Sequence, residues 1–445
     1  MSSGNLLERA EGVLSQVTFL NRQALHLRPD PARVVVRPFK PAVEPRDLNP
    51  TDKTRANHIV ERVMTLDAEM AAHQLADVLE NFQGRHRDLL ATFEARADQM
   101  EDAFSSHAGF SKVQRQLIGA YFLHEYSFEA SALFNPSIVS HPDQSGVTDG
   151  ARRFILSLRA VGEGHVSSLT FRSGWLAADG SVSVDPTARL ATIPKVKNRT
   201  SVADGEDVEV IFKPDEDISE RVIFPITLSQ SNGIEDARFV EFDQDGRKIF
   251  YATYTAYSGT AIRSELIETV DFISFRLSPL RGSAARNKGM ALFPRKIGGK
   301  YAMIGRQDNE NLYLIYSTDL YSWDGGVAIL KPQFPWEFVQ IGNCGSPIEL
   351  NEGWLLLTHG VGPVRKYSIG AVLLDKQDPS KVLARSREPL VRPEPSEREG
   401  YVPNVVYTCG AMRHNGQIVL PYAVSDTFSK FATIKIAALM QSFER

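Results

Sequence analysis

The hydrophobic positions divide the chain into two regions with different periodicity. From about residue 51 to residue 129, apolar side chains recur at spacings of three and four residues, and glycine and proline are rare. This spacing places apolar side chains along one side of a helix. The stripe comprises Ile59, Val63, Met64, Leu66, Met70, Leu75, Val78 and Leu79. The pattern predicts about three helices, with interruptions near Gly84 and Gly109.

Two local signals add detail to this first region. The run from Ser111 to Gln114 has the form of a capping box, which predicts the start of a helix that continues through Phe122. Further upstream, residues 32–39 are rich in β-branched side chains and end near a proline, which is typical of a strand. We expect this strand to join a sheet of the second region.

After Phe134, short β-type runs alternate with glycine, asparagine and aspartate, and one hairpin motif repeats. Each copy has an apolar strand, a tight turn with glycine, and a second strand rich in aromatic and aliphatic residues. Four copies turn about 50 to 60 residues apart, and an earlier fifth copy follows Asn135. The turn residues are Gly150, Gly246, Gly299, Gly353 and Gly416.

This spacing approximates that of propeller blades, which are four-stranded sheets of about 40 to 50 residues. The sequence therefore predicts an all-β five-bladed β-propeller over residues 131–445, preceded by an N-terminal α-helical extension with one strand over residues 1–130. The interval between Gly150 and Gly246 is longer, and we interpret its polar stretch 195–217 as an inserted loop. A β-sandwich also contains many short strands, but it would not repeat one hairpin at such a spacing.

Composition narrows the classes of partner. The net charge is -4, which disfavours a broad surface for nucleic acid or anionic lipid. No stretch has the roughly 20 apolar residues of a membrane span, and the first residues lack the features of a secretory signal, so we expect a cytoplasmic protein. The two cysteines, Cys344 and Cys409, have no metal or redox spacing and are expected to be small buried side chains. No spacing implies a metal or an organic cofactor.

Polar residues recur at matching places in the repeat. In a radial arrangement the innermost strands approach one axis, so such residues would converge on a central site. The inner strands carry Asn135, Glu235, Asp236, Arg238, Lys288, Asn343 and Asn404, and the second strands end near Arg159, Tyr254, Arg306, His359 and Asp426. Each of these alone could be a solvated strand end. Together they combine carboxylates for acid or base catalysis, basic groups for an anion, and hydrogen-bonding groups for sugar hydroxyls. Glycosyl chemistry fits this mixture best.

The assembled motifs resemble glycoside hydrolase family 130, whose members are five-bladed propellers and include β-mannoside phosphorylases and inverting β-mannosidases. The resemblance covers about residues 134–432. It is carried by the following runs, in this order: Phe134-Asn135-Pro136, Leu158-Arg159, Glu235-Asp236-Ala237-Arg238, Tyr254-Thr255-Ala256, Lys288 with Leu292-Phe293-Pro294, Gly299-Lys300-Tyr301, residues 317–323, His359-Gly360-Val361, Leu373-Leu374-Asp375 and residues 402–406.

The resemblance implies a role for each matching residue. Asp236 matches the catalytic acid of the family's phosphorylases, whose proton reaches the glycosidic oxygen through a sugar hydroxyl while phosphate attacks the opposite face. Asn135 and Arg159 match positions that contact the mannosyl ring. We expect Arg238, Tyr254 and Asp426 to bind substrate as well. The expected phosphate ligands are Arg263, Lys288, Arg306 and His359.

Three positions depart from the family pattern. Ala237 stands where proline is usual, and Gly289 stands where asparagine often follows the lysine. After Tyr254-Thr255-Ala256, several phosphorylases have an arginine; this chain continues as Tyr257-Ser258-Gly259, and Arg263 is the nearest basic residue.

Two reactions remain open on the same fold. An inverting hydrolase needs a second carboxylate that activates water, whereas phosphorolysis needs basic residues for its own anionic nucleophile. The candidate bases are Glu268, Glu397, Glu399 and Asp426. We predict first an inverting phosphorylase of β-mannosides that releases α-mannose 1-phosphate and uses inorganic phosphate as co-substrate. The alternatives are an inverting β-mannosidase and, from another class, a glycan-binding propeller without catalysis. The expected partner is a small carbohydrate, and the helical segment is a candidate surface for homo-oligomerisation.

Overall fold

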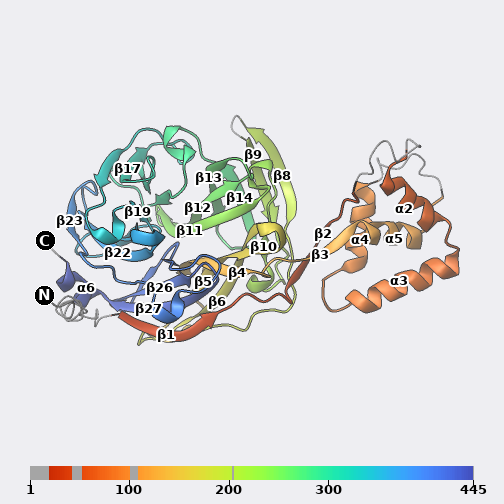
Figure 1. The fold of residues 1–445 in the computed structure, drawn as a ribbon, viewed down its shortest axis with the longest axis horizontal. Helices are drawn as coiled ribbons and strands as arrows, with labels where there is room; N and C mark the ends of the chain where they lie inside the picture. The colour runs from red at the N-terminus through yellow and green to blue at the C-terminus, as the bar shows by residue number, and fades with distance from the viewer. Residues whose placement is uncertain (1–19, 43–52, 101–108, 203–204, 444–445) are drawn as a thin grey trace, which may run out of the picture. The chain divides into compact units, whose positions relative to one another are not determined.

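The computed structural model describes residues 20–42, 53–100, 109–202 and 205–443. The chain divides into two compact units (Figure 1). The first, called the helical unit below, comprises residues 30–130 and 188–193. The second, called the β unit, comprises residues 1–29, 131–187 and 194–445. None of the described helices combines the length and the apolar character that a bilayer crossing requires.

The helical unit packs four described helices around one hydrophobic core. They are α2 (Arg55–Met64), α3 (Ala68–Phe82), α4 (Leu89–Gln99) and α5 (Lys112–Tyr121). The core is formed by residues such as Val63, Leu75, Phe93 and Leu117. The predicted stripe is split between α2 and α3, because Asp67 caps a new helix by accepting a hydrogen bond from the backbone N–H of Met70.

The capping box at Ser111 is confirmed. Its side chain accepts from the Gln114 backbone N–H, and the Gln114 side chain accepts from the Ser111 backbone N–H. The early strand is present as β2 (Val34–Pro38), but the expectation that it joins the second region is wrong. It pairs antiparallel with β3 (Leu123–Ser127) inside the helical unit. The pattern of β-branched residues predicts a strand but does not identify its partner.

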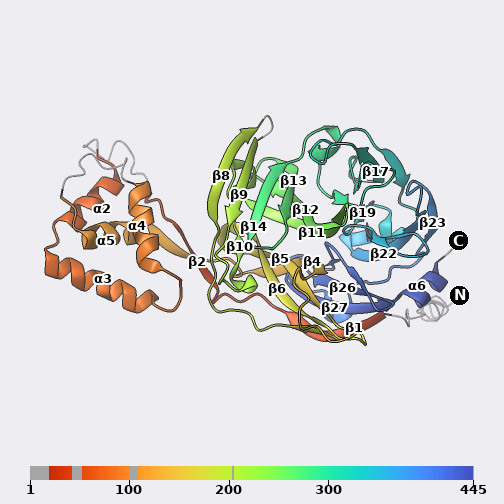
Figure 2. The same ribbon diagram turned by 180° about the vertical axis from the view of Figure 1, so that it is seen from behind.

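In the part of the β unit that the structure describes, the strands form four sheets (Figures 1 and 2). The largest has eleven strands in the order β4 (Ala132–Ser140), β5 (Arg152–Val161), β6 (Ser167–Leu176), β11 (Gly233–Gln244), β12 (Arg247–Tyr257), β13 (Ile262–Thr269), β14 (Ser274–Pro279), β9 (Gly205–Ile211) and β8 (Lys195–Val202), with β7 (Val182–Val184) and β10 (Val222–Ile223) added to β6. This sheet contains two of the predicted hairpins, β4–β5 and β11–β12. The strand β6 lies between them, and it pairs with β11 in parallel, with Gly233 opposite Ser167.

Three smaller sheets contain the other hairpins. The second consists of β15 (Ala291–Leu292), β16 (Tyr301–Gly305), β17 (Leu312–Ser317) and β18 (Val327–Leu330). The third consists of β19 (Gln340–Asn343), β21 (Trp354–Val361), β22 (Tyr367–Leu374) and β23 (Val382–Arg385), with β20 (Ile348–Glu349) on β21. The fourth consists of β1 (Leu20–Leu27), β27 (Phe428–Lys435), β26 (Gln417–Val424) and β24 (Val406–Tyr407), with β25 (Met412–His414) on β26, and α6 (Ile436–Ser442) follows β27.

The polar stretch 195–217 is not simply a loop. Most of it forms the hairpin β8–β9, and β9 pairs with β14 and so extends the large sheet. Val208 and Val210 alternate into the core, whereas every residue of β8 is exposed. The absence of a buried face in β8 explains why its sequence lacks a strand pattern.

The repeat predicted from the sequence is present in the structure. Each of the five turn glycines, from Gly150 to Gly416, has a positive φ, which a residue with a Cβ adopts only with strain. Neighbouring sheets share cores: β11 and β12 pack with β16 and β17, these with β21 and β22, and these in turn with β26 and β27. A last cluster joins Ala423 of β26 to Phe134 and Val161 of the first hairpin. The last hairpin therefore packs against the first.

Candidate active site

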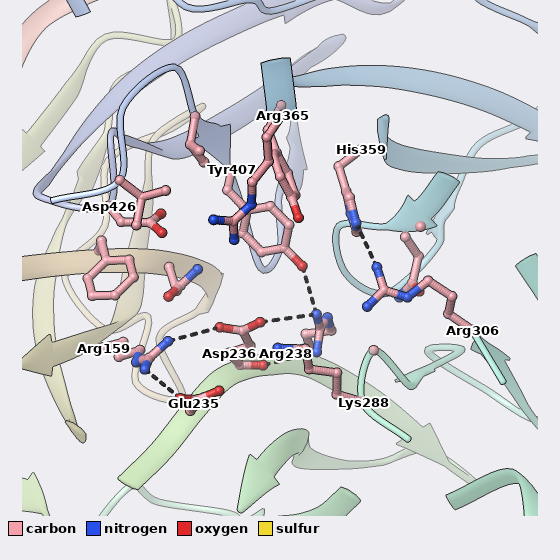
Figure 3. A pocket seen from close by; sticks show the side chains of 18 residues that line it. Arg159, Glu235, Asp236, Arg238, Lys288, Arg306, His359, Arg365, Tyr407 and Asp426 are labelled. Carbon is pink, nitrogen blue, oxygen red and sulfur yellow. Dashed lines mark hydrogen bonds and ion pairs between the residues drawn. The ribbon is translucent and has the colours of Figure 1, made fainter. Parts of the chain in front are cut away.

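A cavity of about 140 Å³ lies in the β unit, lined by residues of all five hairpins and the segments next to them (Figure 3). Its lining is polar. The charged members are Arg159, Glu235, Asp236, Arg238, Lys288, Arg306, Arg365 and Asp426. Asn135, Asn343, His359, Tyr367 and Tyr407 add neutral polar groups. The inner strands of the repeat thus converge on one site, as their matching polar positions predict.

β-Bulges present two of these side chains. In β11 the pairing shifts between Glu235 and Arg238, and in β4 it shifts between Phe134 and Ser137. Each bulge contains a residue in the left-handed region, Asp236 with φ 52° and Asn135 with φ 47°. Such backbone is strained for a residue with a Cβ, and strain of this kind concentrates at functional sites.

The carboxyl group of Asp236 lies between two guanidinium groups. Arg159 Nη1 is 3.7 Å from one of its oxygens, and Arg238 Nη2 is 3.7 Å from the other. Burial by itself raises the pKa of this carboxyl group, but the positive charges of Arg238, Lys288, Arg159 and Arg306 outweigh burial, and the pKa falls below its ordinary value. Asp236 is therefore ionised at neutral pH in this arrangement of charges.

Each guanidinium has a second contact that fixes its position. Arg159 Nη2 donates to Glu235 at 2.6 Å, and the Arg159 guanidinium lies 5.0 Å from the centre of the Phe134 ring. Arg238 Nη1 donates to the backbone carbonyl of Asp236 at 3.2 Å, and its Nη2 donates to the Tyr407 hydroxyl at 2.9 Å. The two arginines therefore hold Asp236 from both sides (Figure 3).

His359 and Arg306 form a second cluster. Arg306 Nη1 lies 3.2 Å from His359 Nε2, and the imidazole stacks on the Tyr367 ring at 5.8 Å. Burial lowers the pKa of His359 well below its ordinary value, and the charges of Arg306 and Arg238 lower it further. His359 is therefore neutral at physiological pH, so it can orient Arg306 but adds no positive charge of its own.

Asp426 differs from Asp236. Burial raises the pKa of its carboxyl group to about 6, and the charge of Asp236 contributes to the rise while Arg159 and Arg365 oppose it. Near neutral pH this group exchanges between an acceptor and a hydroxyl donor, both of which bind sugar hydroxyls.

Eight of the ten predicted site residues line this cavity, and Tyr254 and Arg263 do not. Tyr254 packs in the core of the large sheet, where its hydroxyl donates to Glu265 and accepts from Gln230. Arg263 Nε lies 3.7 Å from the same Glu265, and the arginine lines a separate cavity. Alternation along β12 and β13 directs these side chains away from the cavity, which spacing in the sequence alone does not reveal.

The four candidate bases predicted from the sequence lie in different parts of the structure. Among them, Asp426 lines the cavity. Glu397 is buried in an ion pair with Lys430 at 2.7 Å, Glu268 accepts from the Tyr321 hydroxyl, and Glu399 is exposed. The cysteines, in contrast, are as expected: Cys344 and Cys409 are both free thiols and buried.

Sequence reasoning missed three features of the cavity: the pairing of Glu235 with Arg159 and the presence of Arg365 and Tyr407 in the lining. The repeat could have indicated Arg365. This residue lies in the turn after β21, which matches the turn after β5, and His165 occupies the matching place there; both Arg365 and His165 have positive φ. Within the described ranges no group of three or more His, Cys, Asp or Glu is arranged to hold a metal ion.

The cavity has an excess of positive charge. Among the residues described, five permanently basic side chains and three carboxyl groups line it. Even with all three carboxyl groups ionised, a surplus of positive charge remains, which a small dianion would neutralise.

Several known proteins are similar to this chain in sequence or structure. A 1,2-β-oligomannan phosphorylase from Thermoanaerobacter sp. strain X514 is 36 % identical over 216 residues, covering 47 % of this chain and 71 % of the relative. A β-1,2-mannobiose phosphorylase from the same organism is 35 % identical over 217 residues, covering 46 % and 67 %. The solved structure of a β-1,2-mannobiose phosphorylase from Listeria innocua superimposes with a TM-score of 0.50 at 23 % identity, over 70 % of this chain and 92 % of that chain.

The family comparison covers most of the β unit. The sequence model of glycoside hydrolase family 130, described as β-1,4-mannooligosaccharide phosphorylase, matches residues 202–445. This match spans more than half of the chain and includes the bulge at Asp236, the cluster of Arg306 and His359, and the last two sheets. The protein belongs to glycoside hydrolase family 130.

Proposed function

We propose that this protein is an inverting phosphorylase of β-mannosides, in which Asp236 acts as the acid and inorganic phosphate is the nucleophile. The observation that carries this proposal is the surplus of positive charge around the Asp236 carboxyl group. Phosphorolysis needs such a cluster because its nucleophile is an anion, whereas hydrolysis needs a free carboxylate beside a water molecule. The phosphorylase activities of the relatives support the same choice.

The group of residues around Asp236 and the cluster of Arg306 and His359 would have different roles. Lys288 and Arg306 would bind phosphate, with neutral His359 orienting Arg306. Asn135, Arg159 and Asp426 would hold the mannosyl ring, and Asp236 would donate its proton toward the glycosidic oxygen. Phosphate would attack the anomeric carbon from the opposite face, and the product would be α-mannose 1-phosphate.

Phosphate binding would also prepare the acid. Lys288 and Arg306 are among the charges that lower the pKa of Asp236. When phosphate neutralises them, the carboxyl group regains its affinity for a proton, as an acid catalyst requires. The nucleophile and the proton would thus bind cooperatively.

A hydrolytic base finds less support in the cavity. Of the three carboxyl groups that line it, Glu235 is held by Arg159 at 2.6 Å and Asp236 is the proposed acid. Asp426 is left, and with a pKa of about 6 it is mostly ionised at neutral pH, so it is the carboxyl group that a hydrolytic mechanism would have to use as its base.

The proposal also includes the arrangement of the four sheets. We infer a five-bladed β-propeller over residues 131–445, because five repeated hairpins contribute to one cavity and the shared cores return from β26 to β4 and β5. Residues 30–130 form a separate segment in this proposal, with self-association as a candidate role, whereas β1 joins the last sheet of the propeller. A cytoplasmic setting would supply phosphate, and no organic cofactor is required.

Product analysis tests the function. Purified protein is incubated with β-1,2- and β-1,4-mannobiose, with and without inorganic phosphate, and the sugars are separated by anion-exchange chromatography. Mannose 1-phosphate that forms only with phosphate supports the proposal, and Asp236→Asn should abolish it. Release of free mannose at a rate independent of phosphate would overturn it.

A further inference from the structure

Tyr407 occupies a position that connects the two clusters of the cavity. It lies in β24, it is 8 % exposed, and its hydroxyl accepts a hydrogen bond from Arg238 Nη2 at 2.9 Å. Its ring lies 4.9 Å from the His359 imidazole. Figure 3 shows its hydroxyl directed toward Arg238.

The bond to Tyr407 determines how Arg238 contacts Asp236. Arg238 Nη1 donates to the backbone carbonyl of Asp236 at 3.2 Å, whereas Nη2 is 3.7 Å from the carboxylate. At 3.7 Å this is an ion pair without a hydrogen bond. The guanidinium therefore stabilises the left-handed backbone of Asp236 through Nη1, while Nη2 donates to the tyrosine.

We propose that Tyr407 is a positioning residue: by accepting a hydrogen bond from Arg238, it keeps this guanidinium on the backbone of Asp236 and away from its carboxylate, so that the carboxyl group remains able to take up a proton. This inference rests on the proposed acid role of Asp236. It assigns to Tyr407 a function exerted through Arg238, without contact with the reacting atoms.

The other groups around Asp236 act in parallel. The charged and titratable side chains that face it come from β5, β11, β21, β24 and the segments next to β15, β16, β22 and β26. They are Arg159, Glu235, Arg238, Lys288, Arg306, His359, Arg365, Tyr407, Cys409 and Asp426. The substitution Tyr407→Phe changes none of the permanently charged groups. Its effect on the pH profile therefore measures the loss of the hydrogen bond from Arg238 Nη2 to the Tyr407 hydroxyl.

The experiment compares Tyr407→Phe with the wild-type protein. Without the hydroxyl, the nearest acidic acceptor for Arg238 Nη2 is the carboxylate of Asp236. The stronger contact stabilises the ionised form of the acid, so the decline of kcat/KM at high pH should move down by about one pH unit. We expect kcat to fall about tenfold, with little change in the KM for phosphate.

Two further variants control this result. Tyr422→Phe removes a buried hydroxyl from the core that joins the last two sheets, and it should leave the pH profile unchanged. Arg238→Lys removes the group through which Tyr407 is proposed to act. In that background the addition of Tyr407→Phe should shift the pH profile no further, since the two residues would act in series.

Each outcome decides the proposal. An unchanged pH profile in Tyr407→Phe overturns it, and so does a rise in the KM for phosphate alone, which would mean that the hydroxyl binds the anion. Should the wild-type protein form no mannose 1-phosphate, the proposed function fails by itself. The inference is then decided by the carboxyl ¹³C NMR titration of Asp236 without substrate, assigned with Asp236→Asn: a lower pKa in Tyr407→Phe supports it, and an equal pKa overturns it.

Discussion

The Nη1 atom of Arg306 lies 3.2 Å from Nε2 of His359, and this contact fixes the tautomer of the histidine. A guanidinium can only donate, so Nε2 accepts and the neutral ring carries its proton on Nδ1. His359 therefore contributes to the cavity by orienting a cation.

This relationship predicts different results for two substitutions of His359. Glutamine keeps an acceptor for Arg306, whereas leucine removes it. His359→Leu should raise the KM for phosphate about tenfold, because a hydrogen bond to a charged group is lost. His359→Gln should raise it much less, and the KM for mannobiose should change little in either variant. Equal effects of the two substitutions on phosphate would contradict the account.

Lys288 is predicted to contribute charge to both phosphate and the acid. Lys288→Met should raise the KM for phosphate by about tenfold or more, because a charged donor is removed. It should also raise the pKa of Asp236, since Lys288 is one of the charges that lower it. The decline of kcat/KM at high pH should then move upward.

A matched control is available for this substitution. Lys248→Met removes a lysine whose side chain is 71 % exposed and pairs with Glu241. It should change neither quantity. A fall in the pKa of Asp236 in Lys288→Met would show that the electrostatic account is wrong.

Asp426 is predicted to destabilise the fold when it is ionised. Its pKa of about 6 in the folded protein exceeds the ordinary value of 3.8, so the folded state binds its proton more tightly than the unfolded state does. Its contribution to stability is therefore present below about pH 4 and is lost as the pH rises through about 6. Asp426→Asn should raise the free energy of unfolding at pH 7.5 by about 1–3 kcal/mol.

The same substitution should have little effect on the free energy of unfolding at pH 4, because in the folded protein the protonated Asp426 and the substituted asparagine are both uncharged at that pH. Denaturant unfolding at the two pH values checks this. A loss of stability at pH 7.5 would contradict the assignment of the raised pKa.

Two turn glycines are predicted to differ in their tolerance of alanine. Gly246 has φ 84° and open space around it, so Gly246→Ala adds only the strain of the left-handed backbone, about 1 kcal/mol. At Gly353 an added Cβ would lie 2.3 Å from the carbonyl oxygen of Leu374, so the backbone must shift. Gly353→Ala should lower the melting temperature several times as much as Gly246→Ala, and equal shifts would argue against the turn geometry.

The repeat could be predicted from the sequence because its signals are local. An alternating strand, a turn glycine and a second strand are all set by neighbouring residues, and the five glycines have the positive φ that the pattern requires. The strand at Val34–Pro38 was predicted with the wrong sheet partner, since its pairing with β3 joins segments that are distant in the sequence. The exposed strand β8 was not predicted, since it has no buried face and so no alternating pattern.

The candidate site was predictable to a similar degree. The inner-strand residues Asn135, Asp236 and Lys288 occupy equivalent places in the repeat, and they meet in one cavity. Tyr254 was expected in that cavity, but it packs in the core beside Glu265, because alternation along β12 directs its side chain to the other face of the sheet. No sequence pattern indicated that Tyr407 contacts Arg238, since the two residues are 169 positions apart in the chain.

The central claim is that phosphate is the nucleophile and that the acid is Asp236. The most direct measurement is ³¹P and ¹H NMR of the reaction of β-mannobiose with inorganic phosphate, followed over time in the wild-type protein and in Asp236→Asn. The account predicts that α-mannose 1-phosphate appears as the first anomer, in amounts equal to the phosphate consumed, and that the variant forms none. Free mannose without loss of phosphate, or a β-phosphate product, would contradict it.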